Sequence, residues 1–204
     1  METWNKQEFL ENSIWYHGTS IYGLRSILRN GLSAKFNAKN RLDFGYGVYF
    51  TPNEQWTREY VTRITRADQD FSEDEMGVII VFHFRPIDLG VSYDHIPFFA
   101  KLDDTFCDFV FRNRMYTRYH PITHSVHHYP IVAGVMSDGN QDNDFAEYEN
   151  HVISKKELYR RLKIPKEDWQ LTIHKQALCN KIKPFAAYNL KGDEFDVSAY
   201  KTIQ

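Results

Sequence analysis

The sequence has few cysteines, no long apolar run and little net charge, and each of these absences excludes a class of protein. Its two cysteines, Cys107 and Cys179, have no metal-binding or redox spacing, which fits a reducing compartment. No stretch approaches the roughly 18 consecutive apolar residues of a membrane span. The first residues have neither a basic start nor an apolar run, so we expect no secretory signal and a cytoplasmic location.

The net charge of −2 gives the chain as a whole no electrostatic footprint for nucleic acid. Local basic surfaces remain possible, although plain solvated surfaces explain the same residues. The two basic clusters are Lys35, Lys39 and Arg41, and Arg112, Arg114 and Arg118.

The length and the absence of repeats or linkers indicate a single domain spanning 1–204. We expect its core at 13–185, with 1–12 and 186–204 peripheral. Aromatic residues make up 16% of the chain, which favours strands and an aromatic-lined cleft, although most of them will fill a β-rich core.

Two short apolar segments carry side chains that a core does not need. The first, Trp15–Thr19, predicts a strand that ends in a histidine and a glycine, and glycine lets a ligand approach the backbone closely. The second, 44–51, predicts a strand that presents Tyr49 after a Gly-x-Gly pair. A helix at 20–30 and a polar loop at 33–43 separate them, so we expect a cleft between the two segments.

A third segment predicts a helix. Thr51, Pro52 and Glu54 form a proline-led start and a Thr-x-x-Glu capping box. Thr57 and Tyr60 lie three residues apart on adjoining turns, so the helix presents a hydroxyl and an aromatic ring together. We expect Trp56, on the same helix, to be buried in the core.

The later part of the chain predicts further elements. A nearly continuous apolar run at 77–84 predicts a central strand, with its His83 a hydrogen-bonded core histidine. Four histidines lie within 119–128, but Pro121 breaks the helix that would align them, so we predict no metal site. After residue 182 we expect a tail of marginal structure. The remaining predictions are a helix at 105–119 with Arg112, Arg114 and Arg118 partly outward, a strand at 129–136, exposed carboxylates at Glu147 and Glu149, and a helix at 154–162.

The strand predicted at 169–174 has one wholly polar face. Alternation places Gln170, Thr172 and His174 on that face and apolar residues on the other. Such a face in a small domain either meets water or lines a site. His174 is either a proton carrier or a neighbour of Gln170.

The residues of the first three segments resemble the catalytic core of ADP-ribosyltransferases of the poly-ADP-ribose-polymerase and diphtheria-toxin type. The resemblance rests on His17, Gly18 and Tyr49, and on Thr57 and Tyr60, which follow Tyr49 by eight and eleven positions as in the polymerase family. It implies an α+β fold with split antiparallel sheets, an NAD cleft between them and flanking helices. The sequence of residues 43–47 also resembles that of small bacterial members of the same superfamily.

The resemblance assigns roles around NAD. Gly18, Thr57, Tyr49 and Tyr60 would grip the nicotinamide. His17, beside Thr19, would hold the adenosine ribose. His17, Tyr49 and Gln170 would occupy the three catalytic positions.

The third catalytic position departs from the family. The family has a glutamate there, at the start of a late strand, and this chain has Gln170. Glutamine can still bond to a ribose hydroxyl, but it brings no negative charge. Two hypotheses would restore the charge: Glu147 or Glu149 enters the cleft from the preceding segment, or the acceptor itself brings a carboxylate.

The resemblance implies a mono-ADP-ribosyltransferase that cleaves NAD at the nicotinamide bond. Bacterial relatives of this kind are often toxins or phage-defence effectors, which implies an antitoxin partner. We expect a macromolecular acceptor, with protein slightly favoured over RNA or DNA. The alternatives are an NAD glycohydrolase and an inactive NAD- or ADP-ribose-binding module.

Overall fold

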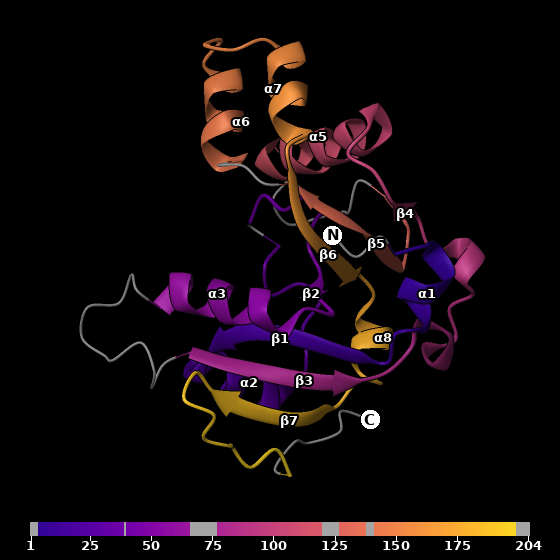
Figure 1. The fold of residues 1–204 in the computed structure, drawn as a ribbon, viewed down its shortest axis with the longest axis vertical. Helices are drawn as coiled ribbons and strands as arrows, with labels where there is room; N and C mark the ends of the chain where they lie inside the picture. Colours follow the sequence, from indigo (N-terminus) through magenta and orange to yellow (C-terminus); the bar gives the residue numbers. More distant parts are fainter. Residues whose placement is uncertain (1–3, 39, 66–76, 120–126, 138–140, 199–204) are drawn as a thin grey trace.

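The structure is a computed structural model that describes residues 4–38, 40–65, 77–119, 127–137 and 141–198. Two small β-sheets and the helices around them make up this part of the chain (Figure 1). The described elements are α1 (Lys6–Glu11), β1 (Ile14–Ser20), α2 (Ile21–Asn30), β2 (Val48–Phe50), α3 (Glu54–Thr65), β3 (Gly77–His83), η1 (Pro86–Leu89), η2 (Tyr93–His95), β4 (Phe98–Phe99), α5 (Asp104–Tyr119), β5 (Ile131–Ser137), α6 (Gln141–Glu149), α7 (Lys155–Leu162), β6 (Pro165–Ile173), α8 (Gln176–Cys179) and β7 (Pro184–Asn189).

The first sheet has the order β1-β3-β7, and the second has the order β2-β6-β5-β4. β4 and β5 run parallel, and the other neighbouring strands run antiparallel. The α+β class with antiparallel sheets and flanking helices is therefore confirmed.

β3 is the central strand of the first sheet, as its apolar run predicts. β1 pairs with one of its edges and β7 with the other. α2 and α3 both pack on β1 and β3. Leu24 of α2 joins the core on the same side as Ile80, whereas Val61 of α3 meets Gly18 on the opposite face. Because helices cover both faces, β3 needs no alternation of polar residues.

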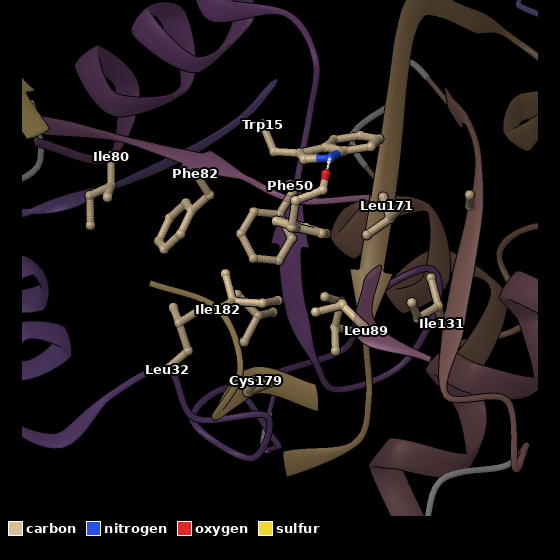
Figure 2. Close-up of a cluster of buried hydrophobic side chains, with 14 of the residues drawn as sticks. Trp15, Leu32, Phe50, Ile80, Phe82, Leu89, Ile131, Leu171, Cys179 and Ile182 are labelled. Carbon is tan, nitrogen blue, oxygen red and sulfur yellow. Dashed lines mark hydrogen bonds between the residues drawn. The ribbon is translucent and has the colours of Figure 1, made fainter. Parts of the chain in front are cut away.

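The main core lies between the two sheets, and Figure 2 shows side chains of both gathered around Phe50. Trp15 of β1 is fully buried there, and its indole N–H donates to the Phe84 carbonyl at 2.9 Å. A second cluster forms where α5, α6 and α7 cover the other face of the second sheet, at one end of the molecule (Figure 1). Its buried members are Phe44, Phe106, Cys107, Val110, Val132, Phe145, Leu158 and Leu162.

α3 begins later than the capping box predicts. Thr51 exchanges both backbone hydrogen bonds with Tyr16 of β1, at 2.8 and 3.1 Å, and is therefore extended rather than helical. Asn53 caps the helix instead, because its side-chain oxygen accepts from the Trp56 N–H at 3.1 Å. Trp56 is partly exposed and belongs to neither core cluster, so the expectation of a core tryptophan is wrong.

The two ends of the chain contribute more than the sequence indicates. Phe9 and Leu10 of α1 are fully buried in the main core. The expected tail is wrong, because β7 pairs with β3 through residue 189. His83 is exposed and stacks on Phe185 of β7, with ring centroids 3.9 Å apart, rather than lying in the core.

No helix in the described part of the chain is long and apolar enough to cross a membrane.

We predict that Trp15→Phe destabilises the fold. The change leaves the buried Phe84 carbonyl without its donor, which costs about 1–3 kcal/mol of unfolding free energy before any loss of packing. Urea denaturation followed by circular dichroism measures it. Trp56→Phe is the matched control and should change stability by less than about 0.5 kcal/mol. Equal effects of the two changes would contradict this account of the core.

Candidate functional site

β1 and β2 meet at a single point and then separate. The only bridge between them in the described chain joins Tyr16 and Thr51. One residue further along β1, the His17 ring lies across the gap, with Nδ1 2.8 Å from the Tyr49 carbonyl oxygen. Since a carbonyl only accepts, Nδ1 carries the proton and donates. We call this opening between the two strands the fork.

The neutral form of His17 is the stable one. Burial lowers its pKa, and the bond to the Tyr49 carbonyl offsets part of that decrease. With Nδ1 protonated, Nε2 holds a lone pair, and no hydrogen bond ties it to a described residue. His17 therefore presents a hydrogen-bond acceptor at the fork.

Gly18 has an open backbone edge at the fork. The N–H and C=O of Tyr16 point away from β3 toward Thr51, and alternation turns those of Gly18 the same way. No described strand pairs with β1 on that side at Gly18. The glycine thus offers one free donor and one free acceptor side by side.

α3 covers Gly18 so closely that no side chain fits. A Cβ there would lie 2.6 Å from Val61 Cγ2, 3.0 Å from Tyr60 Cδ1 and 3.1 Å from Thr57 Cγ2. The fold therefore brings Gly18, Thr57 and Tyr60 together, as the motif spacing suggests. Tyr60 is partly exposed, and burial raises its pKa, so its hydroxyl stays protonated.

Thr57 and Thr19 lie near the fork but turn inward. Thr57 is fully buried and donates its hydroxyl to the Asn53 carbonyl at 3.0 Å, so we do not assign it a ligand contact. Thr19 points to α2, where its Oγ1 occupies the space that a Cβ on Gly23 would need.

The segment Asp43–Gly47, just before β2, is held by side chains at every carbonyl. We call it the clamped segment. Each of its five consecutive carbonyl oxygens accepts one hydrogen bond from a side chain. The donors, in order from Asp43 to Gly47, are Asn113 (3.0 Å), His127 (2.9 Å), Tyr49 (2.7 Å), His174 (2.6 Å) and Asn37 (2.8 Å).

Tyr49 is a donor of this clamp. Its hydroxyl donates to Gly45 and accepts from the Phe44 N–H at 3.1 Å, and its ring packs on the second cluster. Among the described residues no ring contact joins Tyr49 to Tyr60, which stacks on Trp56 instead. The hydroxyl of Tyr49 thus holds the clamped segment by hydrogen bonds, and Tyr60 is the ring that lies beside Gly18.

His174 and His127 are also clamp donors. Their rings meet edge to face, with centroids 4.6 Å apart. Burial and, to a lesser degree, the neighbouring His127 lower the pKa of His174 to about 3; burial also lowers the pKa of His127. His174 therefore holds the Tyr46 carbonyl rather than carrying protons.

The polar face of β6 is buried. Gln170 is 6% exposed, Thr172 is fully buried opposite Tyr49, and His174 is 7% exposed. This face lines the inside of the molecule rather than meeting water. The Gln170 amide forms no hydrogen bond with a described residue, so it is available to a ligand.

The two glutamates proposed as substitutes for a catalytic carboxylate are held in ion pairs. Glu149 lies 3.1 Å from Arg41 and its side chain is 10% exposed, while Glu147 lies 2.8 Å from Arg161. Glu149 is therefore largely buried, and Glu147 is 30% exposed but ion-paired, so neither is the freely exposed carboxylate that the sequence predicts.

The basic clusters are also partly neutralised. Arg114 is buried and pairs with Asp43 at 2.7 Å and Asp142 at 3.0 Å, so its predicted outward position is wrong. Lys35 and Arg112 are exposed. Lys39, the side chain of Arg118 and the histidines before 127 lie outside the described residues. Within the described chain, no group of three or more His, Cys, Asp or Glu side chains could hold a metal ion.

Sequence reasoning missed three clamp donors. Asn37, Asn113 and His127 come from a loop, from α5 and from the segment before β5, and no spacing links them to the clamped segment. The glycines flanking Tyr46 are the one sequence signal, since they mark a backbone that other groups approach closely. A Cβ at Gly47 would lie 2.6 Å from Thr172, and Gly45 has a φ of +82°.

A family described as a protein of unknown function (DUF3990) matches residues 15–183, from the start of β1 to the start of β7. The chain belongs to the DUF3990 family. The match includes the fork, the clamped segment and the polar face of β6, so the whole candidate site lies within the family's shared region. No curated protein and no solved structure matches the chain.

We predict that Tyr49→Phe loosens the clamped segment. The buried Gly45 carbonyl loses its donor and the Phe44 N–H its acceptor, so unfolding free energy should fall by about 1–3 kcal/mol. Urea denaturation checks this, with Tyr22→Phe on the exposed face of α2 as the matched control. A Tyr49→Phe variant as stable as the control would show that the hydroxyl is not needed by the loop.

We also predict a pH dependence from His174. The unfolded chain binds this proton near pH 6.5, but the folded protein binds it only near 3, so stability falls as the pH drops below about 6.5. Between pH 7.5 and 5 the loss is about 2 kcal/mol. His174→Asn keeps a donor near the same position and does not titrate. Denaturation at both pH values should show a smaller acid loss in His174→Asn; an unchanged loss would contradict the assignment.

Proposed function

We propose that this DUF3990 protein is an NAD-dependent mono-ADP-ribosyltransferase with an ADP-ribosyltransferase-like fold, in which NAD binds at the fork. One observation carries the proposal: Gly18, whose backbone edge is open, lies against the Tyr60 ring. A primary carboxamide has an acceptor oxygen next to a donor nitrogen, which complements the free N–H and C=O of Gly18. A flat cationic ring attached to that carboxamide would lie on Tyr60, and nicotinamide has both features.

His17 supports the same placement. Its Nε2 accepts a hydrogen bond, so it suits a ribose hydroxyl, which donates one. The ring is fixed by the Tyr49 carbonyl, and that carbonyl belongs to the strand that the clamped segment precedes. Tyr49 then acts as a positioning residue, through the backbone and the loop.

The side chain at position 170 determines how well the site can stabilise the positive charge that develops on the ribose. Cleavage of the nicotinamide bond develops positive charge on the ribose, and a carboxylate about 4 Å away would stabilise it by about 4 kcal/mol at an effective dielectric of about 20. That corresponds to about a thousandfold in rate. The Gln170 amide orients a ribose hydroxyl but supplies no charge. We therefore propose transfer of single ADP-ribose units at a modest rate, without chain elongation.

The absence of a carboxylate at position 170 favours a second candidate function. A module that binds NAD or ADP-ribose without cleaving it would keep Gly18, Tyr60 and His17, and would not need a carboxylate. An NAD glycohydrolase would use the same site with water as acceptor. The resemblance to small bacterial members favours a toxin or phage-defence effector with an antitoxin partner.

The test uses the full chain with NAD labelled in its ADP-ribose part and a whole-cell extract, digested afterwards with protease or nuclease. We expect labelled macromolecule together with free nicotinamide. Tyr60→Ala should weaken NAD binding about threefold to tenfold, because ring contacts contribute about 0.5–1.5 kcal/mol beyond burial. Tyr22→Ala is the matched control, and calorimetry measures the affinity.

The outcomes separate the candidates. Nicotinamide released without label on a macromolecule indicates a glycohydrolase. NAD bound but left intact indicates the binding module. If the wild-type protein neither binds nor consumes NAD, the proposal fails.

A further inference from the structure

A row of two stacked rings with a cation at each end runs across α3 and onto β6. The rings of Trp56 and Tyr60 stack in parallel, with centroids 5.4 Å apart and planes 10° apart. The Arg63 guanidinium lies 5.7 Å from the Tyr60 centroid, and the Lys166 ammonium lies 5.8 Å from the Trp56 centroid. We call these four residues the aromatic row.

The row contributes to neither hydrophobic core. Trp56 and Tyr60 are both partly exposed, and neither belongs to the two core clusters. Tryptophan and tyrosine rings held parallel at the surface are typical of binding surfaces, because they offer a large apolar face at little cost in conformational entropy. Arg63 forms no ion pair with a described residue, so its charge remains available.

The row begins at the fork. Tyr60 contacts Gly18, and Trp56 continues the stack by one helical turn toward Lys166 at the start of β6. A molecule lying on Trp56 and Lys166 would therefore lie next to a ligand that contacts Gly18 and Tyr60. This is where an acceptor of the ADP-ribosyl group has to come, so the inference rests on the proposed function.

We propose that the aromatic row docks single-stranded nucleic acid, which makes a nucleic acid the acceptor. Bases stack on aromatic side chains in a sequence-tolerant way, and flanking cations contact the phosphates. Of the nearby acidic side chains, Glu54 is compensated by its ion pair with Arg58 at 3.0 Å. The row contributes Arg63 and Lys166, so binding should weaken with salt to the extent of about two released counterions.

The experiment measures binding of a fluorescein-labelled single-stranded RNA of about 12 nucleotides to the full chain by anisotropy, with DNA of the same sequence in parallel. Trp56→Ala should weaken binding about 5- to 100-fold, the effect of losing one stacked base. Lys166→Ala should weaken it less and lower the salt dependence by about one released counterion. Tyr22→Ala and Lys156→Ala are the matched aromatic and cationic controls, since both residues are exposed on other helices. Thermal melts establish that all variants fold.

The results distinguish this inference from the proposed function. If folded wild-type protein binds neither strand at low salt, or if Trp56→Ala binds as the wild type does, the docking surface is refuted. Label that is removed by protease and not by nuclease would also refute it, while the transferase proposal would stand. RNA binding that depends on Trp56, in a protein that leaves NAD untouched, supports the docking surface and refutes the transferase.

Discussion

A buried loop needs a partner for every backbone carbonyl, and in this protein the side chains that satisfy Asp43–Gly47 organise the rest of the site. The clamped segment belongs to no helix or strand, so no ladder pairs its carbonyls. A buried carbonyl without a donor costs about 1–3 kcal/mol. Five side chains provide the donors, and they come from five separate parts of the chain.

This arrangement connects the second cluster to the fork. α5 supplies Asn113, and the same helix packs in the second cluster beside Phe44. His174 comes directly after β6 and continues the alternation that begins with Gln170 and Thr172 on that strand. The clamped segment leads directly into β2, whose Tyr49 carbonyl holds His17 in place. The position of His17 therefore depends on the clamped segment. Of the five side-chain donors of that segment, Tyr49 is the one whose backbone carbonyl bonds to His17.

The polar residues at the end of β6 illustrate what an alternating sequence pattern predicts and what it leaves open. Alternation predicts that Gln170, Thr172 and His174 share a face, and the structure agrees because that period is a property of the strand itself. The pattern alone leaves open whether the face meets water. All three are buried, Thr172 on the side of the second cluster and His174 against His127 and the Tyr46 carbonyl. Trp56 shows the reverse error: an aromatic residue at helical spacing looks like core, yet its helix turns that side to the surface.

The sequence alone determined the features set by local chemistry. These are the apolar run of β3, the helix stop at Gly31 with its φ of +77°, the extended His17–Thr19 segment, and the presence of Thr57 and Tyr60 on one helix. Only the tertiary structure decided that Thr51 pairs with Tyr16 instead of capping α3, that β7 completes the first sheet, and that Tyr49 and His174 serve the clamped segment. Apart from the short-range bond of Tyr49 to Gly45, each of these depends on a partner far away in the sequence, and neither periodicity nor capping preference carries information about such a partner.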